Sequence, residues 1–377
     1  MNKEVIGANL LRIRQVKGLS QKEAAERSGV SRVAYRNIEN GNSIPNVSTL
    51  QNIADGLDVK LQDLFIPVRT LKKVRFRAYK RMNNRDHILT EVVRWLEDYN
   101  YLEEVLQENA DFAFAQFEAP KGPDRAKKAA IQARDILGLN KKEPIHNIAG
   151  LLESNGIKLY PISIASNSFF GLSVSPEEVG PAIIVNVWDR ISVERWIFTT
   201  AHELGHLLLH LNAFDVDITD ENEEQENEAN IFASYFLMPE HAFKSEWKNT
   251  VGLNIIDRVF KVKRIFRVSY KTVLYRLSEK QGPSVWPKFQ HAYKLRFSKT
   301  LAGTEEPQTL KPNTFQYMPE ALRSKEPDSL SPSDFKENRL SNLVQSAIQH
   351  DEITMSRGAE ILGLDLEDMR DRVFAWD

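Results

Sequence analysis

The first 65 residues follow a pattern of short helices separated by turn and cap residues. Apolar side chains recur at helical spacing until the pattern ends at Gly18. Ser20 and Glu23 have the spacing of a capping box, which begins a second helix, and Ser31 is the N-cap of a third. Two further helical patterns cover residues 47–57 and 60–65. We therefore predict a five-helix domain with boundaries 1–68, a length that suits one small domain.

The third predicted helix has a polar outer face. Its spacing points Val33 and Ile38 inward. The side chains left outside are Arg32, Tyr35, Arg36 and Asn37. Side chains of these types reach the edges of nucleic-acid bases, so the domain is a candidate for DNA binding.

We predict a helical connector over residues 69–120. A basic stretch that begins at Leu71 is followed by a long amphipathic pattern. Its apolar stripe consists of Trp95, Leu96, Tyr99, Leu102 and Val105. Because an apolar stripe on a helix needs a partner surface, we expect it to pack on a neighbouring domain or on a second subunit.

Helical and strand patterns are mixed over residues 121–282. A helix is expected from Arg125 to Leu137, and another ends at Gly156 before a strand. Residues 182–186 form a short, wholly apolar run, which is typical of a strand in a buried sheet. We expect this strand to lie beside the long helical segment that follows it.

The C-terminal part divides into a linker and a small helical module. Five prolines interrupt a polar stretch between Ala302 and Ser333, and we predict a Pro-rich linker over residues 283–333. Residues 334–377 are predicted to form paired helices around Gly363. The expected fold is a mainly α multidomain chain with an α+β core.

Length and composition limit the class of protein. A chain of 377 residues has room for two or three domains. It contains no cysteine, so a zinc ion would need histidine and carboxylate ligands. No apolar segment approaches the roughly 20 residues that span a bilayer, and the N-terminus lacks a signal-peptide pattern. We expect a cytoplasmic protein with no membrane partner.

Charge is distributed unevenly along the chain. Residues 1–85 carry 17 Lys and Arg against 7 Asp and Glu, although the whole chain has a net charge of only −2. A basic N-terminal part is typical of proteins that bind nucleic acid. A solvated charged surface is the alternative, and the helical pattern favours DNA.

Residues 195–210 contain a His-Glu-x-x-His motif. His202 and His206 are four residues apart, so one face of a helix presents both imidazoles to a common point, and Glu203 is their neighbour. Two such histidines and a third ligand leave one tetrahedral position of a zinc ion for water. Glu203 is then the candidate proton acceptor.

Residues 5–65 resemble the XRE (lambda-repressor-like) helix-turn-helix family through the run LRIRQVKGLSQKEAAERSGVSRVAYRNIENG. The resemblance implies that the helix after Ser31 enters the major groove of a double-stranded DNA operator. The contacts that it implies are Gln21, Arg32, Tyr35 and Arg36, with Lys22 placed for a phosphate. Operator half-sites about one DNA turn apart would imply a homodimer.

Residues 125–282 resemble the ImmA/IrrE family of metallopeptidases, through the His-Glu-x-x-His helix and the downstream run NEANIFASYFLMPE. By this resemblance the domain is zincin-like, with His202, His206 and Glu228 as zinc ligands and Glu203 as the catalytic residue. Glu226, two residues earlier, is the rival carboxylate, and Glu228 is preferred because its neighbours fit the motif. Manganese is an alternative metal, because imidazole and carboxylate accept both ions.

We predict no separate function for two further polar features near the motif. His210 continues the i+4 series, but one more helical turn lies ~6 Å farther along the axis, so we expect it beside the site or at the surface. The acidic run over residues 215–228 contains eight carboxylates, which we interpret as a solvated loop and helix start.

These features predict a DNA-binding transcriptional regulator with zinc-dependent endopeptidase activity. The family resemblance implies that its protein substrate is a repressor or an antitoxin-like protein. Two alternatives stay open: a non-hydrolytic repressor whose peptidase-like domain senses a ligand or metal, and an antitoxin that binds a toxin. The intact His-Glu-His-Glu set favours hydrolysis.

Overall fold

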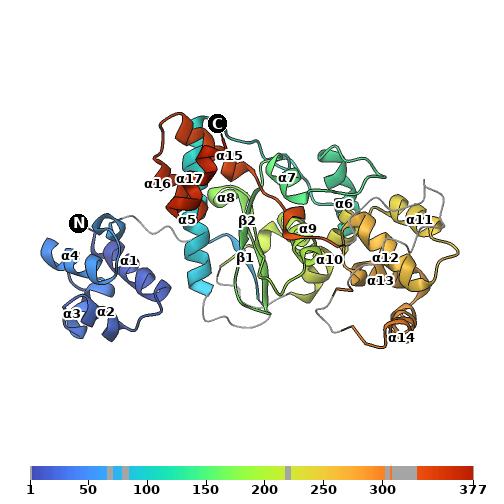
Figure 1. The fold of residues 1–377 in the computed structure, drawn as a ribbon, viewed down its shortest axis with the longest axis horizontal. Coiled ribbons are helices and arrows are strands. Elements are labelled where there is room, and N and C mark those ends of the chain that lie inside the picture. The colour runs from blue at the N-terminus through green and yellow to red at the C-terminus, as the bar shows by residue number, and fades with distance from the viewer. Residues whose placement is uncertain are drawn as a thin grey trace. The chain divides into compact units, whose positions relative to one another are not determined.

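Figure 1 shows the computed structural model of the chain, which describes residues 2–65, 71–78, 85–216, 222–301, 306–307 and 329–376. Within these residues the chain forms seventeen α-helices and a four-stranded sheet. It divides into two compact units, Met1–Leu71 with Arg81–Glu97, and Lys72–Lys80 with Asp98–Asp377. The expected mainly helical fold with an α+β core is confirmed.

The first unit contains the predicted helical domain. Its elements are α1 (Lys3–Val16), α2 (Gln21–Arg27), α3 (Arg32–Glu39), α4 (Val47–Gly56) and the 3-10 helix η1 (Leu61–Leu64). Ser20 and Glu23 form the predicted capping box, and the Ser31 side chain caps α3. Gly7 lets α1 approach the end of α3 closely, because a Cβ there would lie 2.6 Å from the carbonyl oxygen of Glu39.

The second unit is built around a four-stranded sheet. Its strands are β1 (Val74–Ala78), β2 (Lys158–Ile162), β3 (Phe169–Val174) and β4 (Ala182–Asn186), in the order β1-β3-β4-β2. β3 runs antiparallel to β1 and β4, whereas β2 and β4 are parallel. β1 lies in the segment predicted as a helical connector. That segment therefore contributes an edge strand as well as the helix α5 (Arg85–Leu106).

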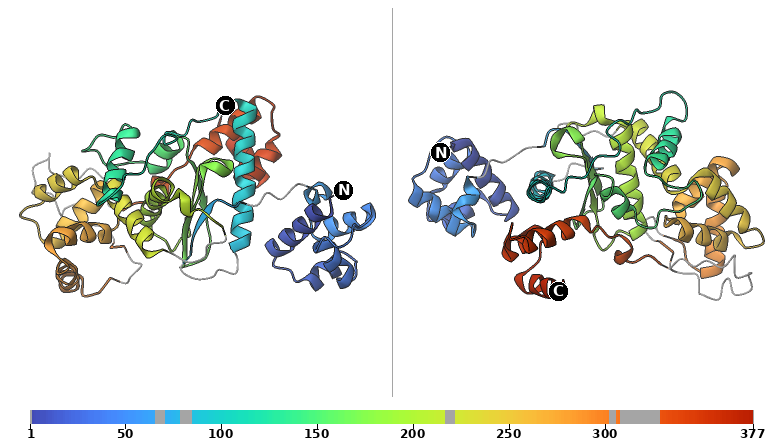
Figure 2. Two further views of the ribbon diagram at one scale, coloured as in Figure 1. Left: turned by 180° about the vertical axis from the view of Figure 1, so that it is seen from behind. Right: turned by 90° about the horizontal axis from the view of Figure 1, so that it is seen from above.

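The helix that carries the His-Glu-x-x-His motif lies along the sheet. This helix, α9 (Val193–Leu209), packs against β3 and β4, as expected from the sequence (Figures 1 and 2). α10 (Glu223–Leu237) packs against α9 and against α6 (Arg125–Ile136). α9 begins after its N-cap Ser192, so Thr199 and Thr200 lie inside the helix. Nearly all side chains of α9 are buried, so its polar motif lies in the interior.

Two buried arginines hold the C-terminal end of α10. The Arg276 guanidinium donates to the carbonyl oxygens of Ser234 and Met238, and Arg134 donates to that of Phe236. Arg276 belongs to α13 and Arg134 to α6. The remaining helices up to residue 281 are α7 (Ile148–Glu153), α8 (Pro176–Val179), the 3-10 helix η2 (Leu211–Ala213), α11 (Glu240–Asn249), α12 (Ile255–Phe266) and α13 (Tyr270–Gln281).

The predicted linker over residues 283–333 begins with a helix. α14 (Val285–Phe297) buries Phe289 and Tyr293 in the core of the second unit. These residues are four positions apart and share one face of the helix, a spacing that the density of prolines farther along conceals. Much of the rest of the predicted linker, residues 302–305 and 308–328, lies outside the described residues.

The C-terminal module is helical, as the sequence pattern indicates. It comprises the 3-10 helix η5 (Pro332–Asp334), α15 (Arg339–Gln349), α16 (Met355–Leu362) and α17 (Leu366–Phe374). α16 ends at Gly363, whose φ of 63° suits glycine. The Glu153 carboxylate accepts hydrogen bonds from the backbone N–H groups of Asn338 and Arg339, and Arg339 also pairs with Glu103. These contacts hold the first turn of α15.

No helix among the described residues has both the length and the apolar character needed to cross a membrane.

Candidate metal centre and DNA-binding surface

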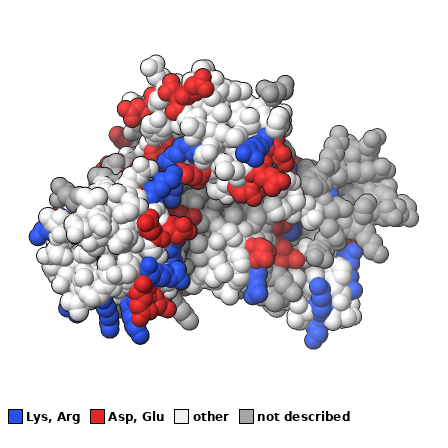
Figure 3. Space-filling view, turned by 60° about the vertical axis from the view of Figure 1, so that its left-hand side comes forward, with Lys and Arg blue, Asp and Glu red and all other residues white. Residues whose placement is uncertain are grey.

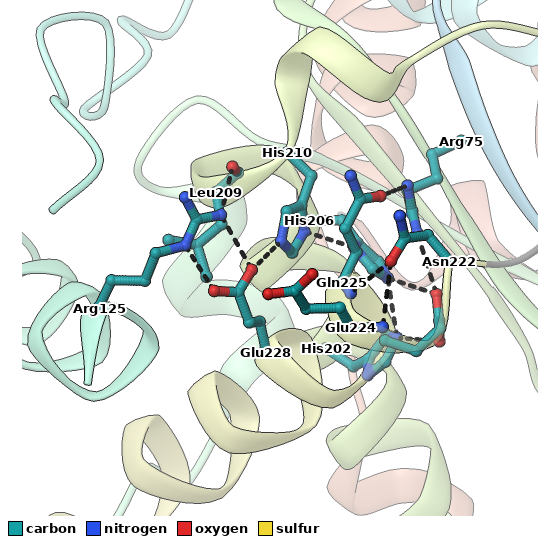
Figure 4. Close-up of polar contacts among 11 residues, drawn as sticks. Arg75, Arg125, His202, His206, Leu209, His210, Asn222, Glu224, Gln225 and Glu228 are labelled. Carbon is teal, nitrogen blue, oxygen red and sulfur yellow. Dashed lines mark hydrogen bonds and ion pairs between the residues drawn. The ribbon is translucent and has the colours of Figure 1, made fainter. Parts of the chain in front are cut away.

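α9 brings the three polar residues of its motif into the interior. His202, Glu203 and His206 each have an exposed fraction of 0%. The two histidines are one helical turn apart and share a face of α9. Their Nε2 atoms are 3.0 Å apart, so both rings face the same point (Figure 4).

Glu226 in the first turn of α10 joins the two histidines. Its Oε1 lies 3.1 Å from His206 Nε2, and its Oε2 lies 3.3 Å from His202 Nε2. A tetrahedral zinc ion that is about 2.1 Å from each ligand separates its ligand atoms by roughly 3.4 Å. The three residues therefore offer the donor types and nearly the spacing that zinc requires, and one ligand atom from each lies within 4.8 Å of the other two.

Glu228, the carboxylate preferred from the sequence as the third ligand, points elsewhere. It forms a two-bonded pair with Arg125, at 2.6 and 2.9 Å, and lies 2.9 Å from His210 Nε2. Two steps along a helix turn a side chain by about 200°, so Glu226 and Glu228 leave α10 on opposite sides. The structure thus brings the rival carboxylate to the histidines, and the preference for Glu228 is corrected.

The second nitrogen of each histidine also has a partner. His202 Nδ1 lies 3.0 Å from Asn230 Oδ1, and His206 Nδ1 lies 2.9 Å from His210 Nδ1. Partners of this kind fix the ring orientation of histidines that bind metals. His210 is buried and lies beside the site, which agrees with the expectation that it is not itself a ligand. Asn230 was not singled out in the sequence, although its i+4 spacing from Glu226 indicates a shared helix face.

Strand β3 lies directly against Glu203. The Ser173 hydroxyl donates a hydrogen bond of 2.9 Å to Glu203 Oε2. The close approach depends on Gly171, because a Cβ there would lie 2.7 Å from Thr199 Cγ2 and 2.8 Å from the carbonyl oxygen of Ile184. β3 thereby orients the Glu203 carboxylate beside the two histidines.

Burial and hydrogen bonding set the protonation of the cluster. Burial lowers the pKa of His206 well below its usual value, and burial also lowers the pKa of His210. Burial acts to raise the pKa of Glu226, but hydrogen bonds with His202 and His206 outweigh it and the pKa is lowered. A neutral imidazole and an ionised carboxylate are the forms that bind a metal.

Arg75 on β1 also contacts the cluster. Its Nη1 donates to Gln225 Oε1 over 2.7 Å (Figure 4). Its Nη2 donates to Glu226 Oε1 over 3.2 Å. In the sequence this arginine is only one member of a basic stretch. Its position beside Glu226 depends on the pairing of β1 with β3, which the connector prediction did not include.

The exposed face of α3 differs from the predicted one. Tyr35, Ile38 and Glu39 are buried, and their i, i+3, i+4 spacing defines the inward stripe of the helix. Val33 is 70% exposed. The predictions that Tyr35 contacts DNA and that Val33 faces the core are therefore wrong, because helix periodicity outweighs the apolar character of one residue.

The other predicted DNA contacts remain near the surface. Arg32, Arg36 and Lys22 are exposed, whereas Gln21 is half-buried and donates a 2.8 Å hydrogen bond to Glu39. Lys22 lies on α2, and Arg32 and Arg36 lie on α3. On the face of the molecule shown in Figure 3, Lys and Arg lie among Asp and Glu in no continuous basic patch. Lys22, Arg32, Arg36 and the half-buried Gln21 stay the predicted DNA contacts.

Two family models match the chain. The model described as "Helix-turn-helix" matches residues 10–64, and the one described as "IrrE N-terminal-like domain" matches residues 152–278. An uncharacterized HTH-type transcriptional regulator, y4dJ of Sinorhizobium fredii, is 37% identical over 65 residues, which are 17% of this chain and 84% of that protein. The chain belongs to the HTH-type transcriptional regulators. Its XRE-type DNA-binding domain is joined to an IrrE-like domain.

Two solved structures of regulators are also similar. A helix-turn-helix family transcriptional regulator from Vibrio cholerae is 27% identical, with 22% of this chain and 51% of that chain covered and a TM-score of 0.17. This HTH-type regulator therefore spans about half the length of that relative. Bacillus thuringiensis PlcR, solved with the peptide PapR7 and DNA, is 14% identical, with 98% and 99% covered and a TM-score of 0.17.

The IrrE-like match covers the three candidate metal ligands but not all of their neighbours. The matched residues 152–278 include α9 and α10, and hence His202, His206 and Glu226. Arg75 and Arg125 precede the matched segment. The regulator therefore builds this region partly from residues that the family match does not cover.

Proposed function

We propose that the IrrE-like domain of this regulator is a zinc-dependent endopeptidase, with His202, His206 and Glu226 as the zinc ligands. The observation that supports this proposal is the convergence of these three donors beside the buried Glu203. Three protein ligands leave the fourth tetrahedral position for water, which is the arrangement of catalytic zinc sites. Structural zinc sites usually have four protein ligands.

The residues of the chain then have distinct tasks in hydrolysis. Zinc, when bound, supplies a Lewis acid that lowers the pKa of a water molecule toward ~7. Glu203 accepts the proton of that water at its carboxylate and delivers it to the leaving amine. Ser173 holds the Glu203 carboxylate in position through its hydrogen bond. Burial of the cluster strengthens these electrostatic interactions, because little water screens them.

We further propose that the substrate is a repressor or antitoxin-like protein bound at the same operator. The covalent union of a DNA-binding domain and a peptidase raises the local concentration of the enzyme near such proteins. Self-cleavage in the Pro-rich segment after Ala302 is less favoured, because proline has no N–H with which an extended substrate pairs.

Elemental analysis and one substitution test the activity. Purified protein should contain about one zinc ion per chain.

Glu203→Gln should retain that zinc and lose hydrolysis, because the side chain moves a proton and does not bind the metal. The variant should therefore hold uncut substrate, which mass spectrometry identifies and the wild-type protein then cleaves in a purified reaction. A chain without zinc would favour the non-hydrolytic sensor, and capture of a toxin that the wild type never cuts would favour the antitoxin.

A further inference from the structure

Two arginines from outside the IrrE-like match reach the candidate metal centre. Arg75 lies on the edge strand β1, and Arg125 is the first residue of α6. The Arg75 guanidinium forms an ion pair with Glu226, and the Arg125 guanidinium forms one with Glu228. The two arginines thus approach different members of the same region, from segments far apart in the sequence.

Arg75 is aimed at α10 by the strand register. It pairs across the antiparallel ladder with Ser173, and directly opposite residues of such a pair point to the same face of the sheet. Ser173 uses that face to reach Glu203. Arg75 therefore extends toward the motif and the first turn of α10, and its side chain is only 12% exposed.

The Arg75 guanidinium spans two neighbouring side chains of α10. One nitrogen bonds Gln225 Oε1 and another bonds Glu226 Oε1. The planar guanidinium has a rigid fork of donors, so two acceptors fix its orientation and it fixes theirs. Because Arg75 holds Oε1, the other carboxylate oxygen, Oε2, stays directed toward His202 at 3.3 Å.

Arg125 is connected to the candidate ligand His206 through two side chains, Glu228 and His210. Its paired bonds fix Glu228, and it also donates to the carbonyl oxygen of Leu209 at the end of α9. Glu228 contacts His210 Nε2, and His210 Nδ1 contacts His206 Nδ1, each over 2.9 Å. The result is a continuous chain of polar contacts from Arg125 to the ring of His206 (Figure 4).

We infer that Arg75 and Arg125 are positioning residues that complete the metal centre: Arg75 orients Glu226, and Arg125 orients His206 through Glu228 and His210. This inference rests on the proposed zinc site. Partners of metal ligands hold them in the geometry that the metal needs, so the ion does not have to order them itself. The segment that matches the IrrE-like family is accordingly incomplete as a metal centre without residues 75 and 125.

The test is the zinc affinity of the full chain, measured by competition with a chromophoric chelator. Arg75→Gln and Arg125→Gln should each weaken zinc binding by about 10- to 100-fold. Arg75→Lys should lie between Arg75→Gln and the wild type, because a single ammonium group does not reproduce the fork. Arg296→Gln is the matched control, because Arg296 pairs with Asp257 over 2.6 Å and takes no part in the cluster. It should keep wild-type affinity.

A second measurement separates positioning from general damage to the fold. Cobalt is substituted for zinc at saturating concentration, and its visible spectrum reports the coordination geometry. Arg75→Gln should change that spectrum while Arg296→Gln leaves it unchanged. If Arg75→Gln does not fold, Gln225→Ala removes one acceptor of the guanidinium and should show the same effect more weakly.

The outcomes distinguish this inference from the function beneath it. Wild-type protein that binds no zinc would overturn the proposed function. Wild-type protein that binds zinc, with equal affinity and equal cobalt spectra in the Arg75 and Arg125 variants, would overturn the positioning inference alone. Tighter zinc binding by Arg75→Gln would also overturn it, because Arg75 would then compete with the metal for Glu226.

Discussion

At the scale of single residues, the first turns of α10 give two nearby carboxylates different partners. Glu226 faces the histidines of α9, and Glu228 faces Arg125 and His210. Both are ionised at neutral pH, since hydrogen bonds with these partners lower the pKa of each despite burial. Helix geometry, and not a difference in their chemistry, therefore decides which of the two carboxylates faces the histidines.

Substitution of the two glutamates should separate their tasks. Glu226→Ala should abolish stoichiometric zinc, because it removes a ligand. Glu228→Ala should retain zinc with an affinity lower by about 10- to 100-fold, because it removes only a partner of His210. Elemental analysis after desalting, together with chelator competition, checks both values. Full zinc in Glu226→Ala would return the ligand role to Glu228.

In the DNA-binding domain, Tyr35 is buried and its neighbour Arg36 is exposed. Tyr35→Ala should lower the free energy of unfolding of this domain by about 3–5 kcal/mol, because it empties a large buried site. Arg36→Ala should leave stability unchanged and lower discrimination among operator bases by about 1–3 kcal/mol. Hydrogen exchange in the full chain and selection from random duplexes measure the two effects. Lys22→Ala is the control that should weaken all DNA sequences alike.

At this scale the motif was predictable and its partners were not. His202, Glu203 and His206 are separated by spacings that one helix turn dictates, so the sequence alone indicates their shared face. The choice between Glu226 and Glu228 depends on the rotation of α10 against α9, which is a tertiary property. The inward position of Tyr35 was open to prediction, because Ile38 and Glu39 share its stripe.

At the scale of elements, the edge strand β1 shows how charge conceals a strand. Val74, Phe76 and Ala78 alternate with Arg75 and Arg77, which is the two-residue period of a strand. The density of basic residues led to an interpretation as a connector. Pairing with β3 over nearly 100 residues of sequence is a long-range contact that local patterns do not report.

The contact between β3 and α9 depends on a missing side chain. Gly171→Ala should destabilise the second unit by about 1–3 kcal/mol, because the added methyl meets Thr199 Cγ2 and the carbonyl oxygen of Ile184. Chemical denaturation measures the loss. Thr199→Ser in the same background removes one of the two contacts and should restore part of the stability. An unchanged midpoint in Gly171→Ala would contradict this account of the packing.

At the scale of the whole molecule, the densest basic segment of the N-terminal part follows the DNA-binding domain in the sequence and precedes the IrrE-like domain. Residues 69–85 contain eight Lys and Arg and no acidic residue, whereas residues 1–68 contain nine against seven. The DNA-binding domain is therefore close to neutral by itself. Arg75, one of the eight, bonds Glu226. The positive balance of the N-terminal part therefore includes at least this one charge that is paired within the second unit.

The attachment of the C-terminal module should depend on pH. Burial raises the pKa of Glu153 to about 7, although the backbone N–H groups of Asn338 and Arg339 act to lower it. Because this pKa is raised above the unfolded value, the contribution of Glu153 to stability is complete below about pH 4.5 and is lost as pH rises through about 7. The free energy of opening of α15, measured by hydrogen exchange, should be larger at pH 6 than at pH 8.

Neutral substitutions identify the titrating group. Glu153→Gln should remove most of the difference between pH 6 and pH 8. Glu337 has a pKa that burial also raises, so Glu337→Gln is the second variant and should remove the remainder. The charged groups that act on Glu153 are Glu337, which raises its pKa, and Arg339, which lowers it and also pairs with Glu103. A wild-type protein with equal opening free energy at both pH values would contradict the assignment.

The contact between Arg75 and Glu226 has a reciprocal consequence for the strand that carries Arg75. If an ordered β1 makes zinc bind 10- to 100-fold more tightly, then zinc must stabilise the docked β1 by the same amount, about 1.4–2.7 kcal/mol. Zinc would thus stabilise the docked position of a strand that supplies none of its proposed ligands. β1 follows the DNA-binding domain in the chain, separated from it by fewer than ten residues. If DNA binding changed the stability of the docked β1 through this short connection, it would therefore also change the zinc affinity.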